Sequence, residues 1–69
     1  MSDGVDELTQ KQRSVLCLFV KGFELDAISE QLGIQRLTAE FHLLSLKQKL
    51  GLFTRQALSQ FARSNGLCP

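Results

Sequence analysis

Four segments of this chain place apolar residues at helical spacing, and a glycine follows each segment. The first helix is expected to begin after Thr9, with Gln12 three residues further on completing a capping box, and to run to about Lys21. Further helices are expected over about 25–32, 37–50 and 54–64, the last with Thr54 as its N-cap. The glycines that end the four helices are Gly22, Gly33, Gly51 and Gly66. No segment alternates with period two, so the sequence predicts an all-α fold of four short helices around one core.

The size of the chain limits what it can do. With 69 residues it can form one small domain, which buries too little surface to build a large catalytic cleft beside its own core. We expect residues 1–7, "MSDGVDE", to form a flexible acidic leader and residues 8–67 to form the domain. The formal net charge of +1 is nearly neutral, whereas a module that binds nucleic acid mainly through phosphates is usually visibly basic.

The residues that carry chemistry in enzymes and metal sites are sparse. The two cysteines and the single histidine lack ligand spacing, so we expect no metal, no cofactor and no disulfide framework. Cys17 is predicted to be a thiol in the core and Cys68 a thiol at a frayed end. No paired carboxylates, activated nucleophile or phosphate loop is evident, so the sequence predicts no catalytic residues and no enzyme.

The sequence also predicts where the chain resides. No apolar run approaches the roughly 18 residues that are needed to cross a bilayer, and the acidic N-terminus does not resemble a signal peptide. We therefore expect no membrane association and a cytoplasmic location.

The second and third helices have the layout of a helix-turn-helix, because a turn of about four residues that contains Gly33 separates them. The layout has limited specificity by itself, since any small helical bundle can place two helices around a glycine turn.

The residues within these helices resemble the DNA-binding domain of the LuxR/GerE family of bacterial transcription regulators from Leu8 to Leu67. The opening "LTQKQRSVL" and the closing "ARSNGL" are similar to the ends of the family pattern, and "GFELDAISEQLGIQ" is similar to its "GxxxxxIAxxLGIS" stretch. The most specific match is between "TAEFHLLSLKQKLGLFTRQA" and the family's "TVxxHxxxIxxKLGVxxRxxA". Region 4 of bacterial sigma factors shares the helix-turn-helix, but "KLGLFTR" and the helix after it favour the LuxR/GerE type.

The resemblance implies that the third helix enters the major groove of duplex DNA. The residues expected near DNA are Arg36, Thr38, Phe41, His42, Ser45 and Lys49, with Lys47 and Arg55 as backbone contacts. For the basic residues the alternative is a solvated surface, and for His42 it is a surface side chain that is hydrogen-bonded to a neighbour.

The resemblance also implies a homodimer that forms through the fourth helix, which carries Ala57, Leu58 and Phe61. The alternative is that Leu58 and Phe61 complete the core. Such domains usually follow a sensor domain, although stand-alone examples exist, and the sequence does not separate these cases.

The third helix has two apolar sides. At about 100° per residue, Ala39, Leu43, Leu46 and Leu50 fall on one side, here called the inner stripe, which the family packs into its core. Leu37, Phe41 and Leu44 fall on the opposite side, here called the outer stripe, together with Gln48.

The outer stripe lies where the family faces DNA, and this chain departs from the family there. It has Glu40 and Leu44 at positions where the family often has lysine, which weakens attraction to phosphates. The alternative function is therefore a helix-turn-helix that binds a protein partner, such as another regulator of the family, through the outer stripe. Two further alternatives are that the N-terminal segment covers the stripe through Val5, or that the helix is rotated.

Overall fold

The computed structural model describes residues 8–68, which form four α-helices. They are α1 (Gln10–Val20), α2 (Leu25–Leu32), α3 (Arg36–Leu50) and α4 (Arg55–Ser64), and the described part of the chain contains no strand. The all-α prediction is confirmed, and the expected helix ends differ from the observed ones by one residue at most. The leader predicted over residues 1–7 lies outside the described residues.

The predicted caps explain where the helices begin and end. The Gln12 backbone N–H donates to Thr9 Oγ1 at 3.0 Å and the Thr9 N–H donates to Gln12 Oε1 at 3.0 Å, which completes the capping box of α1. The Ala57 N–H likewise donates to Thr54 Oγ1 at 3.1 Å at the start of α4. Gly33 ends α2 with a φ of 67°, a left-handed conformation that few other residues adopt without strain.

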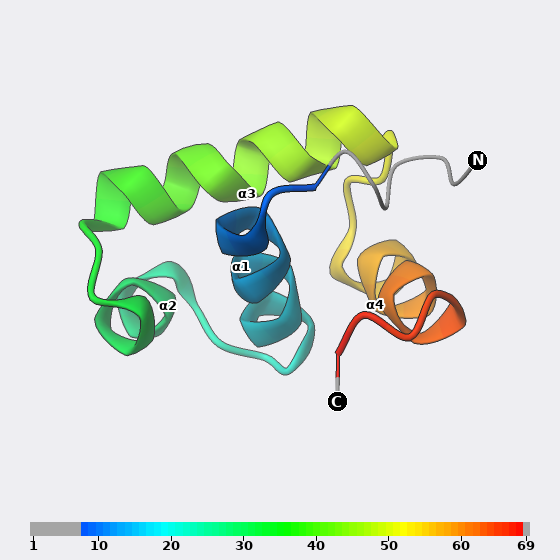
Figure 1. The fold of residues 1–69 in the computed structure, drawn as a ribbon, viewed down its shortest axis with the longest axis horizontal. Coiled ribbons are helices and arrows are strands. Elements are labelled where there is room, and N and C mark those ends of the chain that lie inside the picture. Colours follow the sequence, from blue (N-terminus) through cyan, green and yellow to red (C-terminus); the bar gives the residue numbers. More distant parts are fainter. Residues whose placement is uncertain (1–7, 69) are drawn as a thin grey trace.

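Helix α3 lies across one side of the molecule, α1 and α2 pack against it, and α4 packs against α1 (Figure 1). Helix α1 is central, because it packs against each of the other three helices. The fully or almost fully buried apolar side chains come from the segment before α1 and from all four helices: Leu8, Val15, Leu16, Ile28, Ala39, Leu43, Leu46, Leu58 and Ala62. These contacts fix the orientation of α3 about its own axis.

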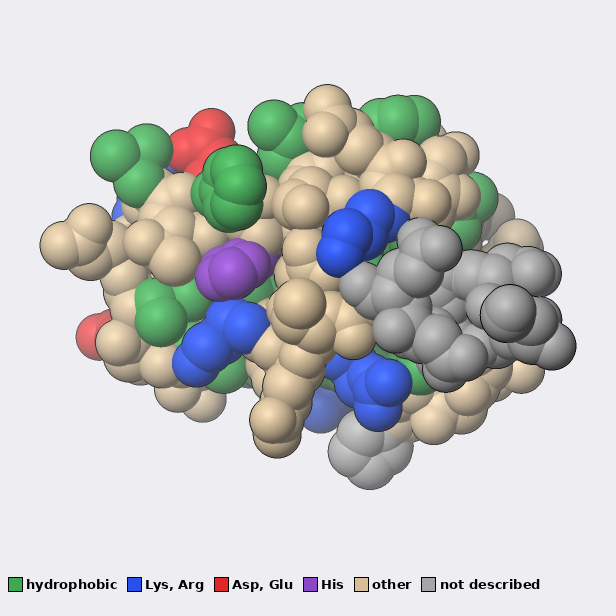
Figure 2. Space-filling model, turned by 45° about the horizontal axis from the view of Figure 1, so that its top comes forward, with side chains coloured by type: hydrophobic (Ala, Val, Ile, Leu, Met, Phe, Trp, Pro, Cys, Tyr) green, Lys and Arg blue, Asp and Glu red, His purple; other side chains and the backbone are tan. Residues whose placement is uncertain are grey.

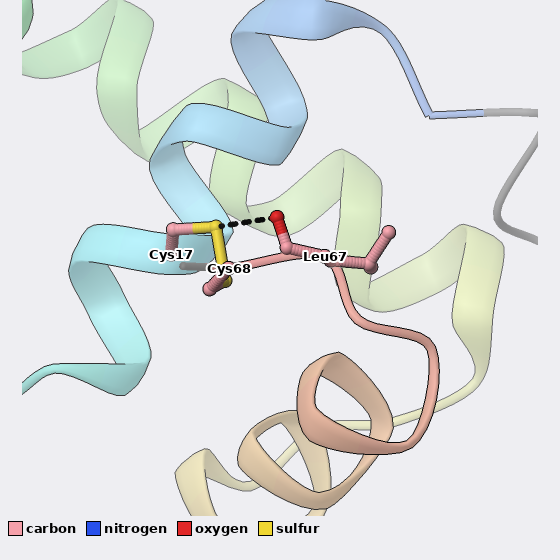
Figure 3. Close-up of a disulfide and its surroundings, with 3 residues drawn as sticks. All are labelled: Cys17, Leu67 and Cys68. Atoms are coloured by element: carbon pink, nitrogen blue, oxygen red, sulfur yellow. Dashed lines mark hydrogen bonds between the residues drawn. A yellow bond between two sulfur atoms is a disulfide. The ribbon is translucent and has the colours of Figure 1, made fainter.

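The prediction of two free thiols was wrong, because Cys17 and Cys68 form a disulfide (Figure 3). After α4 the chain turns at Gly66, and the Leu67 N–H donates to the Ala62 carbonyl at 3.0 Å. This turn brings Cys68 back to α1, so its Cα lies 5.5 Å from that of Cys17 although 51 positions separate them in sequence. The C-terminal segment is therefore tied to α1.

The Cys17 sulfur lies 3.6 Å from the carbonyl oxygen of Leu67. A disulfide sulfur carries no hydrogen, so this contact becomes a hydrogen bond only when the disulfide is reduced and Cys17 has an S–H to donate.

Candidate nucleic-acid interface

The two apolar stripes of α3 have opposite environments. In the inner stripe Ala39 and Leu46 are 0% exposed and Leu43 is 7% exposed, whereas in the outer stripe Leu37, Phe41 and Leu44 are 74%, 66% and 51% exposed. Helix α3 therefore has the rotation that the sequence predicts, and the alternative of an altered rotation is wrong. The remaining alternative is that the N-terminal segment covers the stripe through Val5, which lies outside the described residues.

Polar side chains flank the outer stripe on both sides, because successive residues on a helix are about 100° apart. Thr38, His42, Ser45 and Lys49 fall on one flank, and Arg36, Glu40 and Lys47 fall on the other. In Figure 2 several hydrophobic side chains lie along the top of the view, the histidine and most of the visible basic side chains lie below them, and further hydrophobic side chains lie at the lower left. The face is therefore mixed, with an apolar centre and cations on both flanks.

Ser45 and Lys49 are held in place by a residue of α1. The Gln12 side chain donates from Nε2 to Ser45 Oγ at 3.0 Å and accepts from Lys49 Nζ at 3.2 Å. Gln12 is only 5% exposed, so these bonds are partly shielded from water. The sequence indicates a capping role for Gln12, and no local signal shows that its amide also positions two residues of α3.

His42 is half-buried beside Phe41, and the centroids of the two rings are 6.2 Å apart in an edge-on arrangement. Its Nδ1 is buried and has no hydrogen-bond partner among the described residues. At that atom, the structure therefore gives no support to the alternative of a histidine bonded to a neighbour.

Arg36 connects the two helices of the helix-turn-helix, because its Nε lies 2.7 Å from Asp26 Oδ1 on α2. Both side chains are well exposed, so the pair is screened by water and contributes little to stability. It does place the Arg36 guanidinium at the start of α3, next to the turn.

Lys47 and Arg55 both lie over the ring of Phe19 on α1. The Lys47 Nζ is 5.4 Å and the Arg55 Cζ is 4.2 Å from the ring centroid. Arg55 also donates from Nε to the Phe19 carbonyl at 2.9 Å, and its guanidinium lies 3.6 Å from Glu24. Arg55 thus connects α4 to the end of α1 and the turn after it, a role that the sequence does not indicate.

In α4, the residues of the predicted dimer interface are not equally exposed. Leu58 is 0% exposed and belongs to the core, so it has no surface to offer a partner. Ala57 and Phe61 are half-buried, and Phe61 packs against the core with part of its ring. Of the three, Ala57 and Phe61 retain surface that a second chain could contact.

Within residues 8–68, no group of three or more His, Cys, Asp or Glu side chains lies close enough to hold a metal ion. None of the four helices is both long enough and apolar enough to cross a membrane.

Comparison with known proteins gives two matches. The sequence pattern of the family described as "Bacterial regulatory proteins, luxR family" matches residues 6–62. The chain is also similar to the transcriptional regulatory protein MctR of Rhizobium johnstonii, with 40% identity over 67 residues. The aligned part covers 97% of this chain but 31% of MctR, so the chain spans about a third of that relative's length. No solved structure matches the chain.

Proposed function

Because this chain belongs to the luxR family of bacterial regulatory proteins, we propose that it regulates transcription by placing α3 in the major groove of duplex DNA. The LuxR/GerE resemblance read from the sequence is confirmed over most of the chain. Duplex DNA as the partner, homodimerisation and cytoplasmic location are parts of this proposal.

The observation that carries the proposal is the exposed face of α3. The major groove is about 12 Å wide and admits one α-helix, which has a diameter of about 10–12 Å with its side chains. Helix α3 is 15 residues long, packs against α1 and α2 along one side and leaves its other side uncovered among residues 8–68. A helix held in this way can enter the groove without unfolding any other part of the domain.

The two flanks of α3 supply groups that suit DNA. Lys49 on one flank and Arg36 and Lys47 on the other can contact the phosphates on either side of the groove, because a helix in the groove has a sugar-phosphate backbone on both sides. Thr38, His42 and Ser45 present groups that can form hydrogen bonds with bases or phosphates. Arg55 is a more peripheral backbone contact, because it lies on α4 rather than on α3, and its guanidinium also contacts the Phe19 carbonyl and Glu24.

We propose that two copies of the domain pair through α4, using Ala57 and Phe61. A two-fold dimer would present two α3 helices to successive turns of the same groove, about 34 Å apart. The pairing would explain how a domain with a net charge of +1 obtains useful affinity, because the contacts of two copies add.

The second candidate is a protein-binding domain that uses the outer stripe, and the 74% exposure of Leu37 is the observation in its favour. We place it second because cations lie on both flanks of the stripe, which suits two phosphate backbones better than one apolar partner helix. The matched family and the relative are both described as regulators.

A salt titration tests the proposal. The protein is mixed with labelled duplexes of random sequence, and affinity is measured at salt concentrations from about 50 to 200 mM. We expect log affinity to fall steeply and linearly with log salt concentration. Absence of duplex binding even at the lowest salt concentration would overturn the proposal.

A pair of variants locates the contact. Lys49→Gln removes a cation from the α3 flank and is expected to reduce the salt slope by about 1. Lys21→Gln is the matched control, because Lys21 is an exposed lysine just after α1 and does not lie on α3. If Lys21→Gln reduces the slope and Lys49→Gln does not, DNA does not bind along this face of α3.

A further inference from the structure

The outer stripe is difficult to explain by phosphate contacts alone. Leucine and phenylalanine side chains cannot neutralise phosphates, and they lose favourable interactions if they are held against charged oxygens. A helix in the major groove turns its outermost side chains toward the edges of the base pairs, and the thymine C5-methyl is the large apolar group on those edges.

We propose that the outer stripe makes this domain selective for A·T base pairs, by packing Leu37, Phe41 and Leu44 against thymine C5-methyl groups in the major groove. The inference rests on the proposed function and adds to it the class of base that α3 reads.

The length of the stripe fits this use. Leu37 and Leu44 are seven positions apart, which is about 10 Å along a helix that rises 1.5 Å per residue. A helix in the major groove is inclined to the duplex axis, along which base pairs are about 3.4 Å apart, so the stripe spans at most three base-pair steps. The stripe can therefore contact thymines at two or three adjacent base pairs, and Phe41, near its middle, carries the largest ring.

The charges beside the stripe favour DNA as its occupant. Arg36 and Lys47 lie on one flank and Lys49 on the other, so phosphate contacts on both sides would centre the stripe over the base edges rather than over one backbone. Glu40 is exposed beside the stripe and can accept a hydrogen bond from a cytosine N4 amino group. A site read by this face would thus combine a short run rich in thymine with a neighbouring cytosine.

Replacing thymine by uracil tests the proposal directly, because uracil lacks only the methyl group. Binding sites are first selected from two pools of random duplexes, one made with thymine and one with uracil. We expect the thymine pool to yield sites with A·T pairs at two or three adjacent positions, and the uracil pool to show no preference there. In a selected site, each thymine-to-uracil change is expected to weaken binding about fourfold, the effect of losing one buried methyl.

Substitutions in the outer stripe test whether its side chains cause the preference for thymine over uracil. Leu44→Ala and Phe41→Ala should each weaken binding to the thymine site and reduce the ratio between thymine and uracil affinities toward 1. Phe53→Ala is the matched control, because Phe53 is 60% exposed but lies outside α3, and the ratio should remain unchanged. Both stripe residues are exposed, so these variants are expected to fold.

The outcomes separate this inference from the proposed function. If a selected duplex with thymine and the same duplex with uracil bind with the same affinity and the same steep salt slope, the selectivity proposal is wrong and DNA binding stands. If neither duplex binds at low salt, the proposed function fails as well. If the stripe variants change association with a protein or self-association and leave the thymine-to-uracil ratio at 1, the stripe is a protein interface and the proposal is overturned.

Discussion

The inner and outer stripes of α3 contain the same kinds of residue but have different consequences. Leu46 in the inner stripe is fully buried by its neighbours, whereas Leu44 in the outer stripe, two positions earlier, is half exposed. The two leucines differ in the side of the helix from which they project, and hence in whether α1 and α2 cover them. We expect the inner stripe to determine stability and the outer stripe to determine recognition.

The largest effect is expected from the covalent bond that joins α1 to the C-terminal segment. Reducing the Cys17–Cys68 disulfide should lower the free energy of unfolding by up to about 4 kcal/mol in the chain-entropy treatment, since the bond closes a loop with a sequence separation of 51. Small domains are stable by only a few kcal/mol, so this loss is large in proportion. Denaturant unfolding with and without a reducing agent measures the difference.

The control for this experiment is the variant with both Cys17→Ser and Cys68→Ser. Its unfolding midpoint should be low and should not respond to the reducing agent. A wild-type midpoint that is also unaffected by reduction would show that the bond does not hold the C-terminal segment against α1 in solution.

The next largest effect is expected when a leucine of the inner stripe is replaced, and a leucine of the outer stripe serves for comparison. Leu46→Ala should destabilise the domain by about 3 kcal/mol, within the range of about 2–5 found for buried leucines, because it leaves a cavity in the core. Leu44→Ala is the matched variant and should change stability by no more than about 0.5 kcal/mol. Urea unfolding of the two proteins gives both values, and equal losses would mean that the outer stripe is also covered.

Substitutions of Arg55 test whether this residue mainly stabilises the fold or mainly contacts DNA. Arg55→Ala should lower stability by about 1 kcal/mol, because it removes a hydrogen bond to the Phe19 carbonyl and the stacking of the guanidinium on the Phe19 ring. Arg55→Lys should recover part of this loss but not the stacking. Thermal unfolding measures stability, and an unchanged stability together with a smaller salt slope for DNA would make Arg55 chiefly a phosphate contact.

The smallest effect concerns the one carboxylate on the α3 flanks. Glu40→Gln should raise the affinity for duplexes of random sequence about twofold at low salt, by roughly 0.5 kcal/mol, because it removes repulsion between the carboxylate and the phosphates. The gain should shrink as salt screens the charge. Glu30→Gln on α2 is the control, and an equal gain there would mean that only net charge matters.

The features that could be predicted from the sequence are those set by neighbouring residues. Thr9, Thr54 and the helix-ending glycines act within one turn of the backbone, and the two stripes of α3 follow from helical spacing. The features that could not be predicted join distant segments: the Cys17–Cys68 bond, and the contacts of Gln12 with Ser45 and Lys49 across 33 and 37 positions. These depend on how the helices pack, which no local pattern contains.

The central claim is that the uncovered face of α3 binds DNA while its inner face holds the fold. An NMR titration of the labelled protein with a selected duplex tests this residue by residue. The account predicts that amide shifts change most for Leu37, Phe41, Leu44 and Lys49 and that the signals of Ile28 and Leu58 remain at their folded positions. Shift changes confined to α4, or none on α3 at saturating DNA, would contradict it.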